Sequence, residues 1–142
     1  MKKIAIFFTM VVIIIVGISY MYIDYQKNQK EIKKENKFYE EYLNTETTGT
    51  GIATIINKAM DNNKKNNVEK DSKGKYINNE NNSIKIDFKM LDNDKTYDME
   101  TIFAGGISTF TSYYREIKFK CQKIEYHSSG RVKYLLFEQI TK

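Results

Sequence analysis

Residues 4–23 read IAIFFTMVVIIIVGISYMYI and contain no charged side chain. At about 1.5 Å of rise per residue, a helix of this length spans roughly 30 Å, the thickness of the hydrocarbon core of a bilayer. Met1-Lys2-Lys3 lies directly before the run, and Asp24 ends it. We therefore expect residues 1–23 to form a transmembrane segment that tethers the polar remainder of the chain.

The apolar run also resembles a secretory signal peptide, so two fates of this segment have to be compared. The run is longer than the usual apolar core of a cleaved signal, and no A-x-A sequence follows it. Gly17-Ile18-Ser19 is a weak candidate for a cleavage site. The run has neither a lipobox cysteine nor the glycine and glutamate of a type IV prepilin, so we favour an uncleaved signal-anchor.

The lysines that flank the run give two opposing signals for orientation. Five lysines follow the run within fifteen residues, whereas two precede it. The positive-inside rule would then keep the C-terminal part in the cytoplasm. A short basic start is typical of export signals, however, and long domains translocate largely regardless of charge. We favour an extracytoplasmic C-terminal domain.

Composition limits what the rest of the chain can be. Without the anchor, about 120 of the 142 residues remain, which is enough for one small domain. The net charge of +5 resides mainly in residues 1–37, which carry seven lysines against three acidic side chains. The remaining part is nearly neutral, so we expect no binding to nucleic acid. The single cysteine excludes an intrachain disulfide.

Residues 24–64 are predicted to form a helical stalk with a break at 47–51. Tyr25, Ile32 and Tyr39 are seven residues apart and mark an apolar stripe. The stripe is explained by packing of its last turns on the domain. The alternative, a self-associating coiled coil, is weakened by polar residues at the intervening core positions.

The sequence TTGTG at residues 47–51 separates the stalk into two helices. Its glycines allow a change of direction, and Thr50 is the expected N-cap of the second helix. That helix is predicted to end near Asn62-Asn63. Its apolar side follows the helical spacing i, i+3, i+4, i+7, i+8, formed by Ile52, Ile55, Ile56, Ala59 and Met60.

Residues 65–142 are predicted to form a small α+β domain. Ser83 to Met90 alternates apolar and polar side chains, which indicates a half-buried strand, and Lys75-Tyr76-Ile77 favours a shorter one. Asp98 is the expected cap of a helix that reaches Tyr114, with Gly105-Gly106 inside it at a bend or a close contact.

The last part of the chain is predicted to be a β-hairpin. Its first strand begins at Ile117 and has a bulge near Gln122-Lys123, and the turn is His127 to Gly130. The strand from Val132 to Phe137 has apolar residues on both faces, which is typical of a central strand. The order strand–strand–helix–strand–strand predicts a small antiparallel sheet with helices on one face.

No motif singles out a catalytic, cofactor-binding or metal site. Cys121 and His127 are the only nucleophile-and-base pair, but six residues of one strand separate them by about 20 Å. Asp92 to Asp98 alternates oxygen ligands like a calcium loop, yet Tyr97 and Phe103 stand where an EF-hand needs glycine and glutamate. We therefore expect no enzyme and assign no cofactor.

Three stretches resemble a family of small, uncharacterised membrane-anchored proteins of low-GC Gram-positive bacteria. The resemblance covers roughly residues 36–139 and implies no site residues. An apolar helix that continues into amphipathic helices and a small sheet is also similar to pilins in architecture. The stretches are GTGIATIINKAMDNNKKNNVEKD (49–71), NSIKIDFKMLDNDKTYDMETIFAGG (82–106) and FKCQKIEYHSSGRVKYLLFEQ (119–139).

The sequence thus predicts a non-enzymatic, single-pass envelope protein, with a pilin-like assembly component as the leading hypothesis. Its expected partners are the lipid bilayer, other envelope or pilus-like proteins and further copies of the chain. The alternative is a membrane-tethered extracytoplasmic binding or sensor module. The site of such a module would lie near Asp92–Asp98 and Gly105-Gly106.

Overall fold

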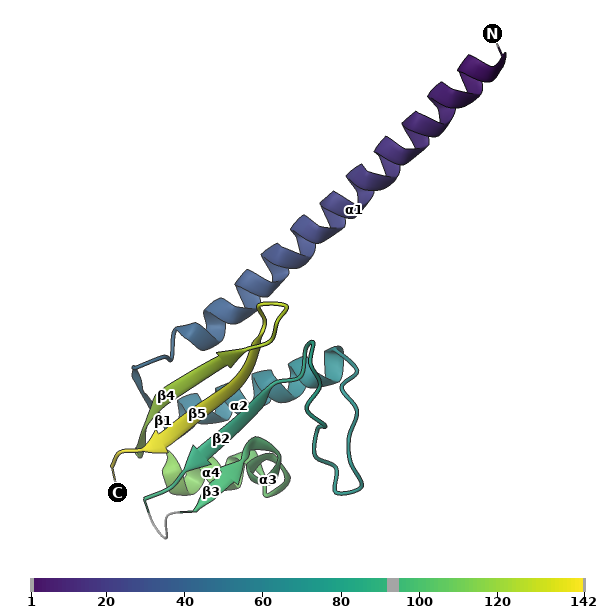
Figure 1. Cartoon of the computed structure of the whole chain (residues 1–142). Helices are drawn as coiled ribbons and strands as arrows, with labels where there is room; N and C mark the ends of the chain where they lie inside the picture. Colours follow the sequence, from purple (N-terminus) through teal and green to yellow (C-terminus); the bar gives the residue numbers. More distant parts are fainter. Residues whose placement is uncertain (1, 92–94, 142) are drawn as a thin grey trace. The chain divides into compact units, whose positions relative to one another are not determined.

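The computed structural model describes residues 2–91 and 95–141. The chain divides into two units, Met1–Lys34 and Glu35–Lys142, which we describe separately. The first is helical, because α1 runs without interruption over Lys2–Glu40 and ends inside the second unit. Figure 1 labels the helices and strands.

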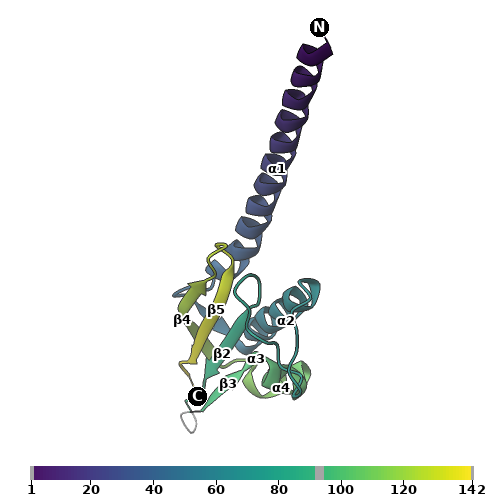
Figure 2. The ribbon, with the colours of Figure 1, turned by 45° about the vertical axis from the view of Figure 1, so that its right-hand side comes forward.

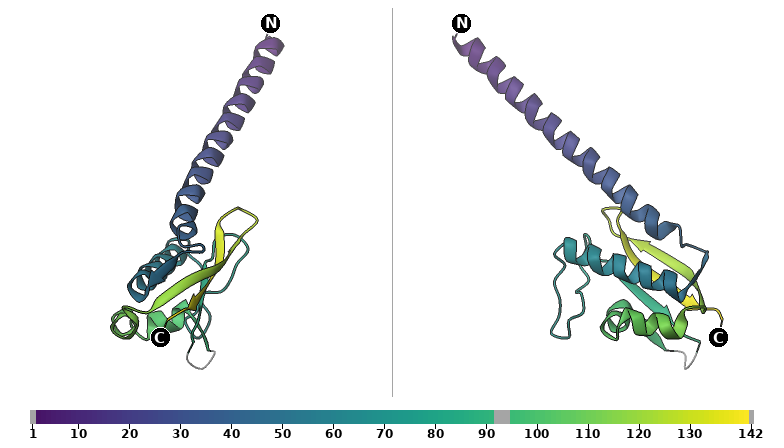
Figure 3. Two further views of the ribbon diagram at one scale, coloured as in Figure 1. Left: turned by 90° about the vertical axis from the view of Figure 1, so that its left-hand side faces the viewer. Right: turned by 180° about the vertical axis from the view of Figure 1, so that it is seen from behind.

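The second unit, Glu35–Lys142, has the predicted α+β architecture. Its sheet has the strand order β1-β4-β5-β2-β3, and Figures 2 and 3 show α2, α3 and α4 on one side of it. The elements after α1 are β1 (Glu46–Thr48), α2 (Gly49–Lys65), β2 (Lys85–Lys89), β3 (Thr96–Asp98), α3 (Met99–Ala104), α4 (Ile107–Tyr114), β4 (Lys118–Tyr126) and β5 (Val132–Gln139).

The sheet is mixed, whereas the sequence analysis expected it to be wholly antiparallel. Strand β5 pairs antiparallel with β4 but parallel with β2, with Ile86 opposite Leu135. The parallel pair arises because the chain between β2 and β5 crosses over through β3, α3, α4 and β4. As predicted, β5 is a central strand, and the bulge in β4 lies between Cys121 and Lys123.

Alternation along the strands builds the core. Ile86 and Phe88 of β2 are fully buried, whereas Lys85, Asp87 and Lys89 remain at least partly exposed. The buried side chains of the sheet pack against one side of α2, whose apolar residues follow the predicted spacing. The largest fully buried side chains of the unit are Tyr39, Phe88, Phe119, Phe137, Ile52, Ile55, Ile56, Ile86, Met99 and Leu135.

Helix boundaries differ from the expectation at several points. Residues 24–45 were expected to be helical, but α1 ends at Glu40. The predicted Thr50 cap is wrong: α2 begins at Gly49, and Thr48 is the capping residue, with no hydrogen bond from its side chain. The cause is strand β1, since Thr48 is already held opposite Lys118 in the sheet.

The compact unit begins at Glu35 and includes α2, whereas the sequence had suggested a stalk over 24–64 and a domain over 65–142. Helix α2 packs its buried side on the sheet and is part of the core. In the segment expected to contain a short strand at Lys75-Tyr76-Ile77, Lys70 and Tyr76 form an isolated bridge.

Candidate functional site

The structure does not bring Cys121 and His127 together. Cys121 lies opposite Phe137 in the core, and burial raises the pKa of its thiol to about 11. His127 lies past the other end of β4, and its Nε2 is 2.7 Å from the carbonyl oxygen of Ser83. The thiol is therefore held in its protonated form in the core, while the imidazole joins the hairpin turn to the start of β2.

Asp98, the last residue of the stretch whose oxygen ligands alternate like those of a calcium loop, caps a helix. Its Oδ1 accepts a 2.7 Å hydrogen bond from the backbone N–H of Thr101, as predicted for a helix cap, and its Oδ2 pairs with Lys75. Partial burial acts to raise the pKa of Asp98, but the hydrogen bonds from Lys75 and Thr101 outweigh it and hold the pKa below its usual value. Asp92, Asn93 and Asp94 lie outside the described residues.

The pair Gly105-Gly106 divides the helix that the sequence predicted from Asp98 to Tyr114. Gly106 has φ of +94°, a conformation that side-chain-bearing residues rarely adopt, and it is the N-cap of α4. Helix α3 therefore ends at Ala104 and α4 begins at Ile107. The bend that the sequence analysis offered as one explanation of the glycines is confirmed.

An apolar hollow of about 230 Å³ lies beside this bend. Tyr97 of β3 is 37% exposed and Tyr113 of α4 is 78% exposed, so two tyrosine rings are accessible at its walls. Among the described residues, no charged side chain lines it. The lining residues are Met90, Tyr97, Thr101, Ile102, Gly105, Gly106, Thr109, Phe110, Tyr113 and Tyr114. Such a lining suits an uncharged apolar or aromatic group.

The hollow lies in part where the sequence analysis placed a binding site. It unites Tyr97, from the Asp92–Asp98 stretch, with both glycines. Sequence reasoning missed Tyr113, because it lies outside the apolar stripe of the predicted helix. That stripe is Met99, Ile102, Phe103, Ile107, Phe110 and Tyr114. An aromatic residue on the polar side of an amphipathic helix was the signal that could have identified it.

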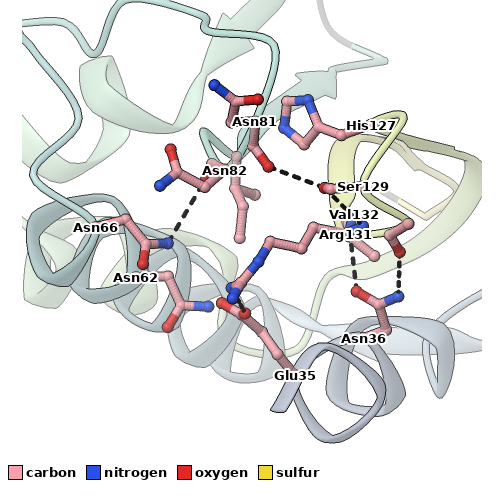
Figure 4. Close-up of polar contacts among 12 residues, drawn as sticks. Glu35, Asn36, Asn62, Asn66, Asn81, Asn82, His127, Ser129, Arg131 and Val132 are labelled. Atoms are coloured by element: carbon pink, nitrogen blue, oxygen red, sulfur yellow. Dashed lines mark hydrogen bonds and ion pairs between the residues drawn. The ribbon is translucent and has the colours of Figure 1, made fainter. Parts of the chain in front are cut away.

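A second feature of the compact unit is a polar cluster at the starting ends of β2 and β5 (Figure 4). Because these strands are parallel, both begin at the same edge of the sheet. The Asn36 side chain donates a 2.7 Å hydrogen bond to the Gly130 carbonyl and accepts one of 2.9 Å from the Val132 N–H. Arg131 pairs with Glu35 beside it, and both side chains are largely buried.

The neighbouring strand is held in the same way. Asn63 donates to the carbonyl oxygen of Ile84 and accepts from its N–H, both at 2.8 Å. Ser129 of the hairpin turn donates to the Asn81 carbonyl at 3.0 Å. Two helix asparagines thus satisfy backbone groups at the starting ends of β2 and β5, so this cluster contributes to holding the fold.

No family model matches the chain, and no curated protein and no solved structure matches it significantly either.

Proposed function

We propose that this chain is a non-enzymatic, single-pass membrane protein that presents the α+β unit outside the cell as a component or accessory of an envelope assembly. One observation carries the proposal: α1 has a stretch long and apolar enough to cross a membrane, and the side chains of that stretch are not buried inside the protein. A stretch of this kind is stable only in an apolar environment, which a bilayer supplies.

The polar end of the stretch supports this proposal. Tyr20 and Tyr22 lie near the end of the apolar run and Tyr25 just beyond it, and all three are exposed. Tyrosines are enriched where a membrane-spanning helix passes from hydrocarbon to head groups, because the ring is apolar and the hydroxyl is polar. Lysines begin at Lys27, just beyond them, and would attract anionic head groups at about 1 kcal/mol each.

The proposal of a role in assembly or binding takes account of how the compact unit holds its reactive side chains. In the described residues, no group of three histidine, cysteine or acidic side chains is placed to hold a metal ion. Cys121 is inaccessible in the core, and His127 is held by a backbone carbonyl. The pilin-like hypothesis rests on the order of elements alone, an apolar helix that continues into an α+β unit.

Protease treatment of intact protoplasts, followed by a blot against the C-terminal hairpin, tests the proposed location. We expect the compact unit to be removed while a cytoplasmic marker protein stays intact. Protection of the compact unit until the membrane is lysed would place it in the cytoplasm and exclude the envelope role. The flanking lysines would then have indicated the correct orientation.

A membrane-tethered binding module is the second candidate, because the uncharged hollow beside Gly105-Gly106 could accept an apolar group. Extraction in mild detergent distinguishes the two candidates. An assembly subunit is expected in large complexes, whereas a tethered binder is expected as a monomer that a ligand stabilises against heat. Tyr113→Ala would remove an exposed wall of the hollow and abolish that stabilisation in the second case only.

A further inference from the structure

Residues 69–77 fold back on themselves and form a short arm after α2. The N–H of Ile77 donates to the carbonyl of Glu69, and the N–H of Asp71 donates to the carbonyl of Lys75, both at 2.8 Å. Gly74 turns the chain with φ of +77°. The arm is therefore a small closed loop with its own hydrogen bonds.

Three contacts dock the arm on the rest of the compact unit. The Tyr76 ring is buried, and its hydroxyl donates to the carbonyl of Met60 in α2 at 3.4 Å. Lys75 pairs with Asp98 at the start of α3. The N–H of Tyr76 donates to Oε1 of Glu100 in α3 at 3.3 Å. Two of the three contacts thus end on carboxyl groups of one short segment.

Glu100 is placed in an unusual way for a carboxyl group. The residue is only 5% exposed, and its Oε2 is buried with no hydrogen-bond partner among the described residues. The charged groups that act on it are Asp98 beside it, Lys85 of β2 and Lys75 of the arm, whose ammonium group is bonded to Asp98. Asp71, also in the arm, acts on Lys75. An ionised Glu100 would leave one oxygen without a partner away from water.

We propose that the arm, residues 69–77, is a pH-dependent flap: neutral Glu100 keeps it docked on α3, and ionisation of Glu100 releases it. Release admits water to the buried oxygen, which removes the cost of holding a carboxylate there. The inference concerns the compact unit alone and does not depend on the proposed envelope role.

The direction of the pH dependence follows from the two carboxyl groups. Burial raises the pKa of Glu100, and Asp98 adds to the effect; together they outweigh the hydrogen bond from the Tyr76 N–H, which favours the ionised form. Docking therefore loses stability as the pH rises from the ordinary glutamate value of about 4.3 towards the raised one. The pKa of Asp98 is lowered, so its pairing with Lys75 is lost only as the pH falls below the ordinary aspartate value of about 3.9. Docking is therefore tightest in mild acid and weaker at neutral pH.

Release of the arm would change a hollow that the arm lines together with α2 and α3. Lys70 and Tyr76 of the arm line a hollow of about 610 Å³, with Met60 of α2 and Phe103 of α3 on other walls. The Lys70 ammonium lies 4.5 Å from the centre of the Tyr76 ring. Release of the flap would expose Tyr76 and widen this hollow.

Amide hydrogen exchange of the full chain in detergent micelles, from pH 4.5 to 8, tests the proposal. Protection of the Tyr76 amide, which donates to Glu100 rather than within the arm, is corrected for the intrinsic exchange rate at each pH. It should fall about tenfold per pH unit until Glu100 is ionised, then level off. Strand β5 serves as the internal control for global unfolding. Glu100→Gln, which mimics the neutral carboxyl, should keep the arm protected throughout, while Glu80→Gln at an exposed site should behave like the wild type.

The proposal is overturned by any of three results. The first is a level protection profile of the wild-type arm, which decides the question even if the glutamine variant does not fold. The second is a fall in the Glu100→Gln arm as steep as in the wild type, since the release would then depend on another group. A fall in β5 parallel to that in the arm also overturns it, because the whole unit would be opening.

Discussion

The apolar part of α1 and the core of the compact unit use the same side chains in opposite surroundings. Ile13 in the helix is 64% exposed, whereas Ile55 in α2 is fully buried. Burying such a side chain contributes about 1.5–3 kcal/mol, so the compact unit is stabilised from within. Burial would stabilise the apolar side chains of α1 in the same way, but no other part of the described structure buries them. A shared composition can thus serve a core or an external apolar environment, and the spacing of the residues decides which.

Removal of a large ring from the core should have the largest effect, and it tests whether apolar burial stabilises the compact unit. Phe137→Ala should lower the free energy of unfolding of the compact unit by about 3–5 kcal/mol, because the fully buried ring stacks on Phe88 with 5.7 Å between centroids. Denaturant unfolding measures the change. Membrane retention should stay unaffected, and a variant that is both folded and lost from the membrane would contradict the separation of the two regions.

A charge in the apolar part of α1 should weaken membrane insertion and leave the stability of the compact unit unchanged. Ile13→Lys is expected to disfavour membrane insertion by about 2.5–3.5 kcal/mol, since an ammonium group would lie near the middle of the apolar run. Fractionation of cells measures the share of protein that stays with the membrane. Gln26→Lys, beyond the run, is the matched control and should remain bound. Unfolding of the compact unit should be the same in both variants.

Loss of the hydrogen bonds between Asn63 and the backbone of Ile84, which we call the clamp, should destabilise the unit less than loss of a core ring. Asn63→Ala should destabilise the compact unit by about 1–3 kcal/mol, because the buried N–H and carbonyl of Ile84 would each lose a 2.8 Å hydrogen bond. Thermal unfolding measures it. Asn57→Ala, at an exposed position of the same helix, is the control for helix propensity, and equal effects at the two sites would contradict the clamp.

The parts of the fold that could be read from the sequence are those where a pattern repeats. Residues 84–90 alternate over a whole strand, and α2 shows its apolar side over three turns, so both were predicted. Strands β1 and β3 have three residues each, too few for any period to show. The parallel pairing of β2 and β5 depends on the path of the chain between them, which no local pattern contains.

The candidate sites show the same limit. Gly105-Gly106 drew attention as two helix-weakening residues, but the hollow beside them also needs Tyr97 from β3 and Tyr113 from α4, which only the fold brings together. Glu100 gave no signal at all, because a glutamate in the first turn of a helix is ordinary. Its contact with the arm joins residues 24 positions apart, with β2 and β3 between them, and such a contact has no sequence signature.

The two glycines at the bend offer the finest comparison, since they are adjacent and differ in conformation. Gly106→Ala places a side chain at φ of +94° and 3.3 Å from the Thr109 hydroxyl oxygen, so we expect a loss of about 1–2 kcal/mol. Gly105→Ala is the matched control. Its φ is −71°, and a methyl group there would meet only ordinary contacts of 3.4 Å or more.

Gly105→Ala should therefore be neutral or slightly stabilising, because alanine restricts the unfolded chain more than glycine does. Thermal unfolding of the pair gives the comparison directly, since both variants add one methyl group to adjacent residues that line the hollow. If both lose the same stability, then filling the hollow rather than straining the backbone is the cause. If only Gly106→Ala does, then the bend requires that glycine, and Gly105→Ala becomes the variant with which to narrow the hollow and leave the fold unchanged.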